Sequence, residues 1–392
     1  MNNKFIIIIP TMNRIETLRG SLATVLSQNY QNYSVIISDN SIDDETQKYI
    51  KNLSDPRIDY YKTGGGLSMT ENWNFALSKI SDRNSFVSIM GDDDGLSINC
   101  LSRINEIIVE TNLNSYVASW AYYKWKNLER DAGFLSFGSN VGYEIRNSIR
   151  DFKKVLLSKR EYTQIPHIYT GGFIKFNEIE KIKKGDEFLG SIYPDVYSSV
   201  GLSLSVDKYV FIKENLVICG TSAKSNSAAI CGLVSGKEAF HEFIQQNTHK
   251  IAPFFNGADL KNISLCVLDA YLNFMEKDSK LIVPPRMILI NALKRGLFDY
   301  KNSKELVDLL LIRNNLKKIN LLNRVFIYWG IYLNSFKKIY FYFLAARIYT
   351  GSHSIADIHQ ASIFMDGFLF HRKYKLIDKI KLLIMKIRND KY

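Results

Sequence analysis

The chain has few cysteines and no segment that resembles a secretion signal. Its 392 residues include four cysteines, none of them in a C-x-x-C spacing: Cys100, Cys219, Cys231 and Cys266. Scattered cysteines are typical of free, mostly buried thiols in a reducing compartment and argue against a disulfide framework or a zinc site. The apolar run Phe5–Ile9 is too short for a signal-peptide core. We therefore expect a cytoplasmic protein.

Long apolar runs and glycine-rich nucleotide motifs are missing as well. No stretch of about 18 apolar residues is free of Asn, Lys and Arg, so we expect no membrane-spanning helix. The turn after the first strand-like run reads Pro10-Thr11-Met12-Asn13-Arg14, whereas a dehydrogenase needs G-x-G-x-x-G there. The G-x-x-x-x-G-K-[ST] motif of P-loop ATPases is also absent. Both classes are excluded.

Positive charge is concentrated in the last part of the sequence. The formal net charge is +12, and nearly all of that excess lies in residues 301–392. Within this part, Lys373–Arg388 carries isoleucines and leucines on one helical stripe and lysines around it. Such a helix either lies on an anionic membrane surface or packs on protein, in this chain or in an oligomer. The tail shows no nucleic-acid recognition motif, so we expect no nucleic-acid partner.

The first 120 residues alternate between strand-like and helical patterns. The strand-like runs are Phe5–Ile9, Ser34–Ser38, Ile58–Tyr61, Phe86–Met90 and Tyr116–Ser119, and the helical patterns between them are Glu16–Ser27, Asp43–Asn52, Thr70–Lys79 and Asn99–Thr111. This alternation predicts an α/β fold, a Rossmann-like, mostly parallel sheet flanked by helices. In such a sheet, ligands bind beyond the carboxyl ends of the strands.

The remaining residues divide into two parts. We expect the α/β domain to span residues 1–235, with residues 120–235 building an acceptor pocket. Residues 236–392 are predicted to form a mainly α-helical, basic C-terminal region. Helical patterns in that region cover Leu306–Leu311, Leu321–Leu333, Ile339–Tyr349 and Leu376–Ile387.

Three consecutive carboxylates, Asp92, Asp93 and Asp94, stand between two glycines directly after the run Phe86–Met90. Like charges this close repel one another unless a cation neutralises them. Carboxylate oxygens suit Mg²⁺ or Mn²⁺, which also bind phosphate oxygens. The alternative is a solvated turn, because Asp and Gly are common turn residues. The triplet alone leaves both interpretations open.

Polar turns follow each of the first four strand-like runs. They are Pro10-Thr11-Met12-Asn13-Arg14, then Asp39–Asp44, then Gly64–Gly66 with Glu71–Asn74, and finally Gly91–Gly95. One such turn is weak evidence, because Asn, Asp, Ser and Gly make turns and helix caps in every protein. Four in succession at the same edge of a sheet indicate one binding site. The N–H groups of Gly64–Gly66 either hold phosphate or belong to a plain loop.

This pattern resembles the N-terminal half of glycosyltransferase family 2, whose fold is called GT-A, over about residues 4–235. The resemblance implies a nucleotide-sugar site, with uridine as the expected base, and a D-x-D motif for a divalent cation. Gly91 stands where many members have the first acid, so Asp93 fits the metal-ligand role best among Asp92, Asp93 and Asp94. The residues expected to bind the nucleotide sugar are Pro10, Thr11, Asn13, Arg14, Asp39, Asn72, Asp92 and His167.

An inverting transfer also needs a carboxylate within hydrogen-bond reach of the acceptor hydroxyl. By the same resemblance, Asp195 in Tyr193–Ser199 fits this catalytic base best. Asp195 beside Pro194 is equally typical of an ordinary helix start. Asp186 and Glu187 are the reserves, in a stretch that resembles a solvated loop.

Further residues have both a functional and a structural interpretation. His167, in the segment Pro166–Gly172, either bonds the sugar or diphosphate or is a structural hydrogen-bonding group. Trp120 and Trp125 either stack on sugar rings or pack in the core. Lys224, in the loop Gly220–Asn226, either closes over the phosphates or belongs to a connector.

The expected function is an inverting glycosyltransferase that uses a nucleotide-diphosphate sugar, with UDP as the expected carrier, and a divalent cation. The expected acceptor is a growing saccharide or a polyprenyl-linked one, in capsule, O-antigen (lipopolysaccharide) or other surface-polysaccharide synthesis. The basic tail would keep the enzyme peripheral, on the inner face of a bacterial cytoplasmic membrane. Two alternatives are a sugar-nucleotide nucleotidyltransferase, which would need a glycine-rich basic loop after the first strand, and a non-catalytic membrane-binding adaptor.

Overall fold

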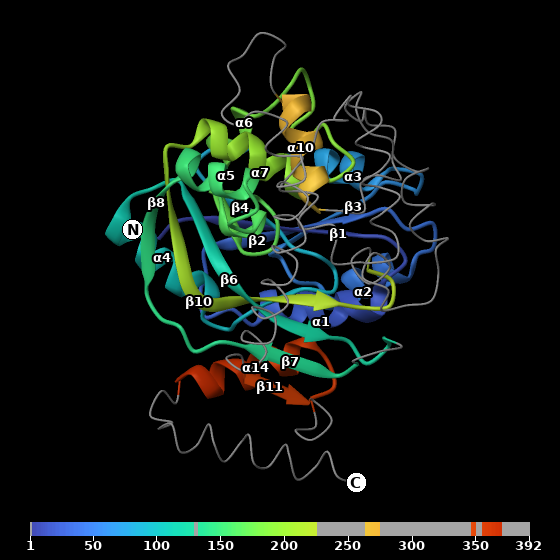
Figure 1. The fold of residues 1–392 in the computed structure, drawn as a ribbon. Helices are drawn as coiled ribbons and strands as arrows, with labels where there is room; N and C mark the ends of the chain where they lie inside the picture. The colour runs from blue at the N-terminus through green and yellow to red at the C-terminus, as the bar shows by residue number, and fades with distance from the viewer. Residues whose placement is uncertain (1, 129–131, 226–262, 275–345, 350–354, 371–392) are drawn as a thin grey trace, which may run out of the picture.

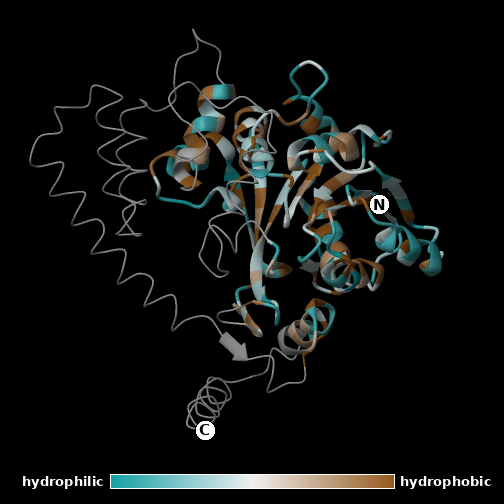
Figure 2. Cartoon of the chain, turned by 90° about the vertical axis from the view of Figure 1, so that its right-hand side faces the viewer, coloured by the Kyte–Doolittle hydropathy of each residue, from teal (hydrophilic) through white to brown (hydrophobic). Residues whose placement is uncertain are grey.

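The computed structural model describes residues 2–128, 132–225, 263–274, 346–349 and 355–370 (Figure 1). In this part of the chain a sheet is covered by helices on both faces, so the α/β class predicted from the sequence is confirmed. Apolar residues concentrate in the strands and on the helix faces that cover them (Figure 2).

The first half of the sheet is parallel, as predicted. Strands β1 (Phe5–Thr11), β2 (Tyr33–Asp39), β3 (Ile58–Lys62) and β4 (Phe86–Ile89) lie side by side in the order β3-β2-β1-β4. Helices α1 (Ile15–Leu26), α2 (Glu45–Leu53), α3 (Met69–Ser78) and α4 (Cys100–Thr111) alternate with these strands, within a few residues of the predicted bounds.

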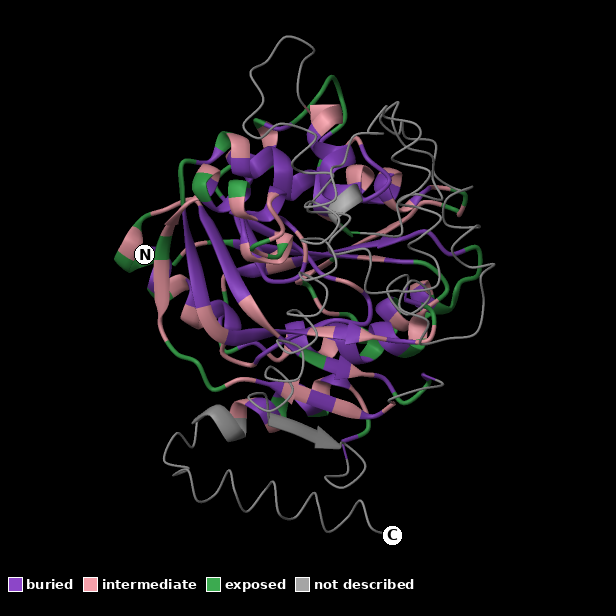
Figure 3. Cartoon of the chain, viewed as in Figure 1, coloured by how far each residue is buried: buried purple, intermediate pink, exposed green. Residues whose placement is uncertain are grey.

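The apolar run at the start of the chain serves both faces of the sheet. Ile6 and Ile8 belong to the core on one face, and Phe5, Ile7 and Ile9 belong to the core on the other. A strand that is buried on both faces needs apolar residues at every position rather than at every second one. Figure 3 shows this continuous burial in the middle of the molecule.

The second half of the sheet is mixed. It contains β5 (Gly95–Leu96), β6 (Ser115–Lys124), β7 (Phe134–Phe137), β8 (Tyr143–Asn147), β9 (Gly172–Lys175) and β10 (Lys208–Thr221). Strand β9 is antiparallel to both β4 and β6, between which it lies. Strand β10 runs parallel to β6, and register shifts between Ile212 and Val217 let its second half also pair with β5. Its last residues thereby reach the acidic turn after β4.

Five further helical segments cover the face that carries α3 in the described part of the chain. They are α5 (Ser148–Leu156), η1 (Tyr162–Gln164), α6 (Phe176–Glu180), α7 (Pro194–Ser205) and α10 (Ile263–Phe274). Helix α7 contacts α3, α5, α6 and α10. It begins with Pro194 in its first turn and Asp195 beside it, as the sequence predicts for a helix start.

Two segments from the last fifty residues complete the described fold. Strand β11 (Ala346–Tyr349) pairs antiparallel with β7, and α14 (Ile358–Phe370) packs against α1 and β5 (Figure 1). The helix predicted over Ile339–Tyr349 is therefore wrong at its end, where edge pairing with β7 makes a strand. Leu306–Leu311, Leu321–Leu333, Leu376–Ile387 and the stripe in Lys373–Arg388 lie outside the described residues.

Glycines let α14 approach the sheet closely. A Cβ atom at Gly20 of α1 would lie 3.3 Å from the Ile358 side chain, and one at Gly95 of β5 would lie 3.2 Å from it. Ile358 is fully buried, whereas Ile363 on the same helix is 48% exposed. None of the described helices is long and apolar enough to cross a membrane.

The thiols agree with the expectation from spacing. Cys100 and Cys266 are buried and Cys219 is partly buried, and none of the three is part of a disulfide between described residues. Cys231 lies outside the described residues.

If α14 is an integral part of the fold, Ile358→Ala will lower the free energy of unfolding by about 2–4 kcal/mol, because it empties a buried site between two glycines. Ile363→Ala on the same helix is the matched control and should change it by no more than about 0.5 kcal/mol. Urea denaturation followed by circular dichroism measures both. Equal effects of the two substitutions would show that α14 is not packed as described.

Candidate functional site

The acidic turn at the carboxyl end of β4 is buried. Asp92, Asp93 and Asp94 are 3%, 4% and 0% exposed, so the alternative of a solvated turn is wrong. Three adjacent carboxylates without water must be compensated by the protein or by a ligand. The protein provides a different set of partners for each of them.

Asp94 fixes the turn to two distant segments. Its Oδ1 accepts a hydrogen bond from the N–H of Gly220 at 2.7 Å, and its Oδ2 accepts one from the N–H of Gly91 at 3.1 Å and another from the Thr170 hydroxyl. Burial raises the pKa of Asp94, and these hydrogen bonds oppose that rise. A Cβ atom at Gly91 would lie 2.8 Å from Asp94 Oδ2, which explains why glycine occupies this position.

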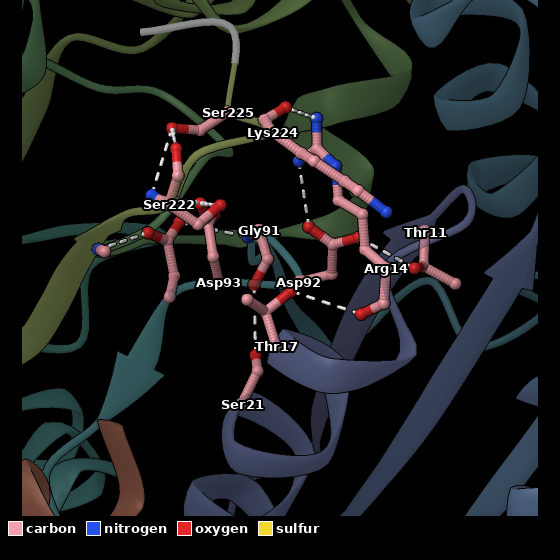
Figure 4. Close-up of polar contacts among 12 residues, drawn as sticks. Thr11, Arg14, Thr17, Ser21, Gly91, Asp92, Asp93, Ser222, Lys224 and Ser225 are labelled. Carbon is pink, nitrogen blue, oxygen red and sulfur yellow. Dashed lines mark hydrogen bonds and ion pairs between the residues drawn. The ribbon is translucent and has the colours of Figure 1, made fainter. Parts of the chain in front are cut away.

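Asp92 joins the turn to the residues that follow β1. The Thr11 hydroxyl donates to its Oδ2 at 2.7 Å, and Arg14 Nη1 donates to its Oδ1 at 3.1 Å (Figure 4). Burial opposes the charge of Arg14, but Asp92 and Asp93 raise the pKa of its guanidinium above the ordinary value. The predicted residues Thr11, Arg14 and Asp92 are therefore brought together.

Asp93 is the least compensated of the three. Both the N–H and the hydroxyl of Ser222 donate to its Oδ2, at 3.2 and 2.7 Å (Figure 4). Its Oδ1 accepts no hydrogen bond from any residue that the structure describes. Burial, followed by the charges of Asp94 and Asp92, raises the pKa of Asp93 to about 7, against the lowering effects of Arg14 and Ser222. The repulsion expected from the sequence is thus concentrated on this carboxylate.

The three carboxylates do not converge on one point. Among the described residues, no three His, Cys, Asp or Glu side chains form a cluster that could hold a metal ion. The oxygen ligands nevertheless suit a divalent cation at Asp93, because one oxygen of this carboxylate accepts no hydrogen bond from a described residue. Mg²⁺ needs only one or two protein carboxylates when water and phosphate supply its other ligands. Asp94, whose two oxygens are occupied, fits the ligand role poorly.

Asp39 and Asn72 lie at the carboxyl end of β2 and on α3. Asp39 is buried and accepts hydrogen bonds from Ser41 N–H at 2.9 Å and from the Tyr60 hydroxyl at 2.7 Å. The Ser41 hydroxyl in turn accepts the N–H of Asn13 at 2.8 Å, which joins the turns after β1 and β2. The amide of Asn72 exchanges two hydrogen bonds with Ser38 and is buried.

Two predicted residues near this edge have mainly structural contacts. Pro10 is part of β1, in register with Ser38 of β2. Asn13 has a positive φ of 55°, a left-handed conformation that asparagine tolerates better than most residues. Gly64, Gly65 and Gly66 also have positive φ, and in the described structure they form a loop near Ile42.

A loop after β10 closes over the residues after β1. Lys224 Nζ donates to the carbonyl oxygen of Asn13 at 2.8 Å, and Arg14 donates to the carbonyl oxygen of Lys224 (Figure 4). A cavity of about 220 Å³ lies beneath this loop, lined among others by Asn13, Arg14, Asp43, Asn127, Ser222 and Lys224. Two cationic side chains, Arg14 and Lys224, thus line this cavity, as does Ser222, the hydrogen-bond partner of Asp93.

Asp195 lies in the first turn of α7 and is partly exposed. Burial raises its pKa, and a 2.6 Å hydrogen bond from the Tyr162 hydroxyl to its Oδ2 opposes that rise. Burial raises the pKa of Tyr162 well above its ordinary value, and Asp195 and Cys219 raise it further. Burial raises the pKa of the Cys219 thiol well above its ordinary value, and the charges of Asp94 and Asp93 raise it further. Cys219 directly precedes Gly220, whose N–H donates to Asp94, so the regions around the acidic turn and the predicted base are coupled electrostatically through Cys219 and Tyr162.

His167 and the two tryptophans also lie near this region. His167 is fully buried, its Nδ1 lies 2.8 Å from the carbonyl oxygen of Ile165, and burial lowers its pKa, so the ring is neutral. Its Nε2 has no hydrogen-bond partner among the described residues. The Trp120 ring packs edge-on against the His167 ring, with 6.4 Å between the two ring centroids. Trp125 has the structural role, because its indole N–H donates to the carbonyl oxygen of Asp93 at 2.9 Å.

The reserve acids lie apart from these contacts. The Asp186 side chain is fully exposed, and Glu187 forms a turn with Lys184, so this stretch is a surface loop as its sequence indicates. Sequence reasoning did not single out Thr170, Ser222, Tyr60 or Tyr162 individually. Ser222 and Thr170 lie inside segments that the sequence marked for Lys224 and for His167, whereas Tyr60 and Tyr162 became visible only through their partners.

Comparison with known proteins gives one family and two curated relatives. Residues 6–173 match the family model described as Glycosyl transferase family 2. The chain is similar to the minor teichoic acid biosynthesis protein GgaA of Bacillus subtilis (strain 168), with 28% identity over 43% of this chain and 36% of that protein. It is also similar to a GalNAc(5)-diNAcBac-PP-undecaprenol beta-1,3-glucosyltransferase of Campylobacter jejuni, with 32% identity over 26% of this chain and 33% of that protein. The chain thus spans about a third of the length of the curated relatives it matches.

Solved structures with a similar fold share little sequence with the chain. One is S. aureus TarS 1-349 in complex with UDP-GlcNAc, with 13% identity, a TM-score of 0.44 and coverage of 80% of this chain and 92% of that one. Another is the mannosyltransferase PcManGT from Pyrobaculum calidifontis in complex with GDP-Man and Mn2+, with 12% identity, a TM-score of 0.46 and coverage of 95% and 88%. These similarities concern the fold alone.

The raised pKa of Asp93 predicts a pH-dependent stability when divalent cations are removed with a chelator. The folded state binds a proton that an unfolded aspartate releases near pH 4, so this contribution to stability is complete below pH 4 and lost as the pH rises to about 7. Asp93→Asn removes the buried charge and should raise the free energy of unfolding at pH 8 by on the order of 2–4 kcal/mol, with little change at pH 4.

Asp186→Asn is the control, because it makes the same change of charge on a fully exposed side chain. Thermal denaturation at a series of pH values measures all three proteins. A wild-type protein whose stability relative to Asp93→Asn does not change between pH 4 and pH 8 would contradict this account of the acidic turn.

Proposed function

We propose that this chain, whose residues 6–173 match the model of glycosyltransferase family 2, transfers a sugar from a nucleotide-diphosphate sugar to a hydroxyl group of a saccharide during cell-surface polysaccharide synthesis. The observation that carries the proposal is the buried, incompletely compensated acidic turn beside Thr11 and Arg14. The names of the two curated relatives support the biosynthetic context.

The donor would bind at the carboxyl ends of β1, β2 and β4. We assign the base and ribose to the side formed by Pro10, Thr11, Asn13 and Asp39, with a uracil base as the preferred fit. The diphosphate would lie toward the acidic turn, where Arg14 and Lys224 supply positive charge near the cavity. A diphosphate that accepts the hydrogen bonds of Arg14 would release Asp92 from its ion pair.

Asp93, with Asp92 beside it, would hold a divalent cation, Mg²⁺ or Mn²⁺. Such a cation, when bound, neutralises the charge that grows on the departing diphosphate. Asp94 has a different task in this proposal: its hydrogen bonds to Gly91, Thr170 and Gly220 keep the turn in shape. Asn72 likewise would act by holding the end of β2 through Ser38.

Asp195 would act as the general base. In its ionised form it accepts the proton of the acceptor hydroxyl while that oxygen forms a bond to the anomeric carbon. The bond from the anomeric carbon to the diphosphate oxygen breaks, and its electron pair leaves with the nucleoside diphosphate. Attack from the side opposite the leaving group inverts the anomeric configuration. His167, with an unpartnered Nε2 near Trp120, is assigned to the sugar-binding side.

The acceptor is proposed to be a lipid-linked or growing saccharide. The support is the name of the Campylobacter jejuni relative, which specifies a saccharide on undecaprenyl diphosphate. A peripheral position on the inner face of the cytoplasmic membrane follows as part of the same proposal. The basic stripe in Lys373–Arg388 that would make the contact lies outside the described residues, so this contact stays a prediction.

Titration calorimetry with UDP, GDP, CDP and ADP, each with and without Mn²⁺, tests the donor and cation together. We expect one nucleoside diphosphate, UDP, to bind in the presence of Mn²⁺ and to bind at least about tenfold more weakly without it, because a cation held by Asp93 would supply positive charge for the diphosphate. Asp93→Ala should abolish this Mn²⁺-dependent gain.

Asp186→Ala serves as the charge-matched control and should bind like the wild type. Asp195→Asn should retain binding and lose about 100-fold or more in the rate of sugar transfer or donor hydrolysis, as expected for loss of a general base. The proposed donor site would be refuted if no nucleotide binds. It would also be refuted if the affinity for UDP changes neither with Mn²⁺ nor with Asp93→Ala.

A further inference from the structure

A tyrosine on η1 makes a short contact with the carboxylate at the start of α7. The Tyr162 hydroxyl lies 2.6 Å from Asp195 Oδ2 and donates a hydrogen bond to it. This distance falls within the range of about 2.5–2.7 Å for a hydroxyl bound to an ionised carboxylate. The two residues are 33 positions apart, so tertiary structure rather than local sequence creates the contact.

We propose that Tyr162 is a positioning residue for Asp195: its hydroxyl orients the carboxylate and stabilises the ionised form that accepts a proton. The proposal deepens the function given above and rests on the role of Asp195 as the base. A hydrogen bond to the charged form of an acid favours ionisation, whereas burial favours the neutral acid. Burial makes Asp195 a stronger base by raising its pKa, and the hydrogen bond from Tyr162 limits that rise, so that the carboxylate stays ionised.

Tyr162 is itself held in place. The N–H of Ile165 donates to the carbonyl oxygen of Tyr162 at 3.3 Å, and the carbonyl oxygen of Gln164 accepts the Tyr209 hydroxyl at 2.7 Å. The ring packs against the apolar core that α7 and α10 share. A donor fixed in this way loses little side-chain entropy when its hydrogen bond forms, so it can define the direction of the carboxylate.

Besides Tyr162, two titratable groups interact electrostatically with the same carboxylate: Tyr193 before α7 and Cys266 on α10. Two more groups act on these neighbours: Cys219 on β10 raises the pKa of Tyr162, and Asp269 on α10 raises those of Tyr193 and Cys266. Acidic residues of the other helices packed on α7 have partners elsewhere. Glu71 of α3 accepts a hydrogen bond from the N–H of Ser68. Asp151 of α5 forms ion pairs with Lys154 and Arg160, and Glu178 of α6 forms one with Lys181.

Within the described residues, Tyr162 is the side chain that lowers the pKa of Asp195; the other lowering contacts are the backbone N–H groups of Asp195 and Val196. A helix N-terminus adds a modest stabilisation of negative charge. No lysine or arginine contributes to this balance in the described part of the chain. Loss of the Tyr162 hydroxyl should therefore raise the pKa of Asp195.

The test measures the ionisation of Asp195 on the full chain without any ligand. The carboxyl C=O stretch of Asp195 is isolated as the infrared difference between the wild type and Asp195→Asn over a series of pH values. Tyr162→Phe should raise the pKa of this carboxyl by about one unit, the shift that corresponds to one lost hydrogen bond to a charged group. Tyr143→Phe is the matched control, because the Tyr143 hydroxyl also donates to a carboxylate, that of Glu110, outside this region.

Replacement of Tyr162 by 3-fluorotyrosine, a stronger donor of the same shape, should shift the pKa of Asp195 downward, and it decides the matter if Tyr162→Phe fails to fold. An unchanged pKa in the Tyr162 variants, or an equal shift in Tyr143→Phe, would overturn the proposal. The pH profile of donor hydrolysis then separates the two ideas. If the acidic limb of the profile moves to higher pH together with the carboxyl in Tyr162→Phe, both hold. A carboxyl that shifts while the profile stays in place supports the positioning bond and refutes Asp195 as the base.

Discussion

The burial of three neighbouring carboxylates at the end of β4 is the constraint on which the site depends. Each carboxylate removed from water must find donors or charges, and the chain supplies them from separate places. Asp94 takes hydrogen bonds from Gly91, Thr170 and Gly220, while Asp92 takes the hydroxyl of Thr11 and the charge of Arg14. In the described part of the chain the Asp93 carboxylate accepts hydrogen bonds from Ser222 alone, and its pKa stays raised. The remaining charge is the feature that a cationic ligand would relieve.

The fold brings these partners together through strand order. Because β1 and β4 are adjacent and parallel, their carboxyl ends meet, and the residues after β1 contact the residues after β4. The irregular register of β10 carries Gly220 and Ser222 to the same place from the opposite half of the sheet. Residues from both halves of the sheet therefore meet at the acidic turn. Cys219, which directly precedes Gly220, couples this turn electrostatically to Tyr162, the hydrogen-bond partner of Asp195.

Local patterns predicted the elements of the first half of the chain well, because strands buried on both faces and amphipathic helices carry their signal in adjacent residues. The edge of the sheet where the site lies followed from the same reasoning, and so did the start of α7. The sequence also indicated the repulsion within Asp92–Asp94, but it did not indicate how it is compensated. Thr170, Ser222 and Tyr162 act through contacts over 76, 129 and 33 positions, and no local rule gives such pairings. Strand β11 was missed for a similar reason, since it is a strand by virtue of pairing with β7.

The packing of α14 on α1 has a consequence for the order in which the molecule can assemble. Ser27, at the end of α1, and His359 of α14 are 332 positions apart, and the Ser27 hydroxyl lies 2.9 Å from His359 Nε2. The Ser362 hydroxyl donates to the carbonyl oxygen of Leu96 across 266 positions. During synthesis on the ribosome, the side of α1 that contacts α14 stays uncovered until residues 358–370 have been made. Folds closed by such distant contacts form slowly and expose apolar surface on the way. The apolar surface beneath α14 is therefore among the last parts of the described fold to be buried.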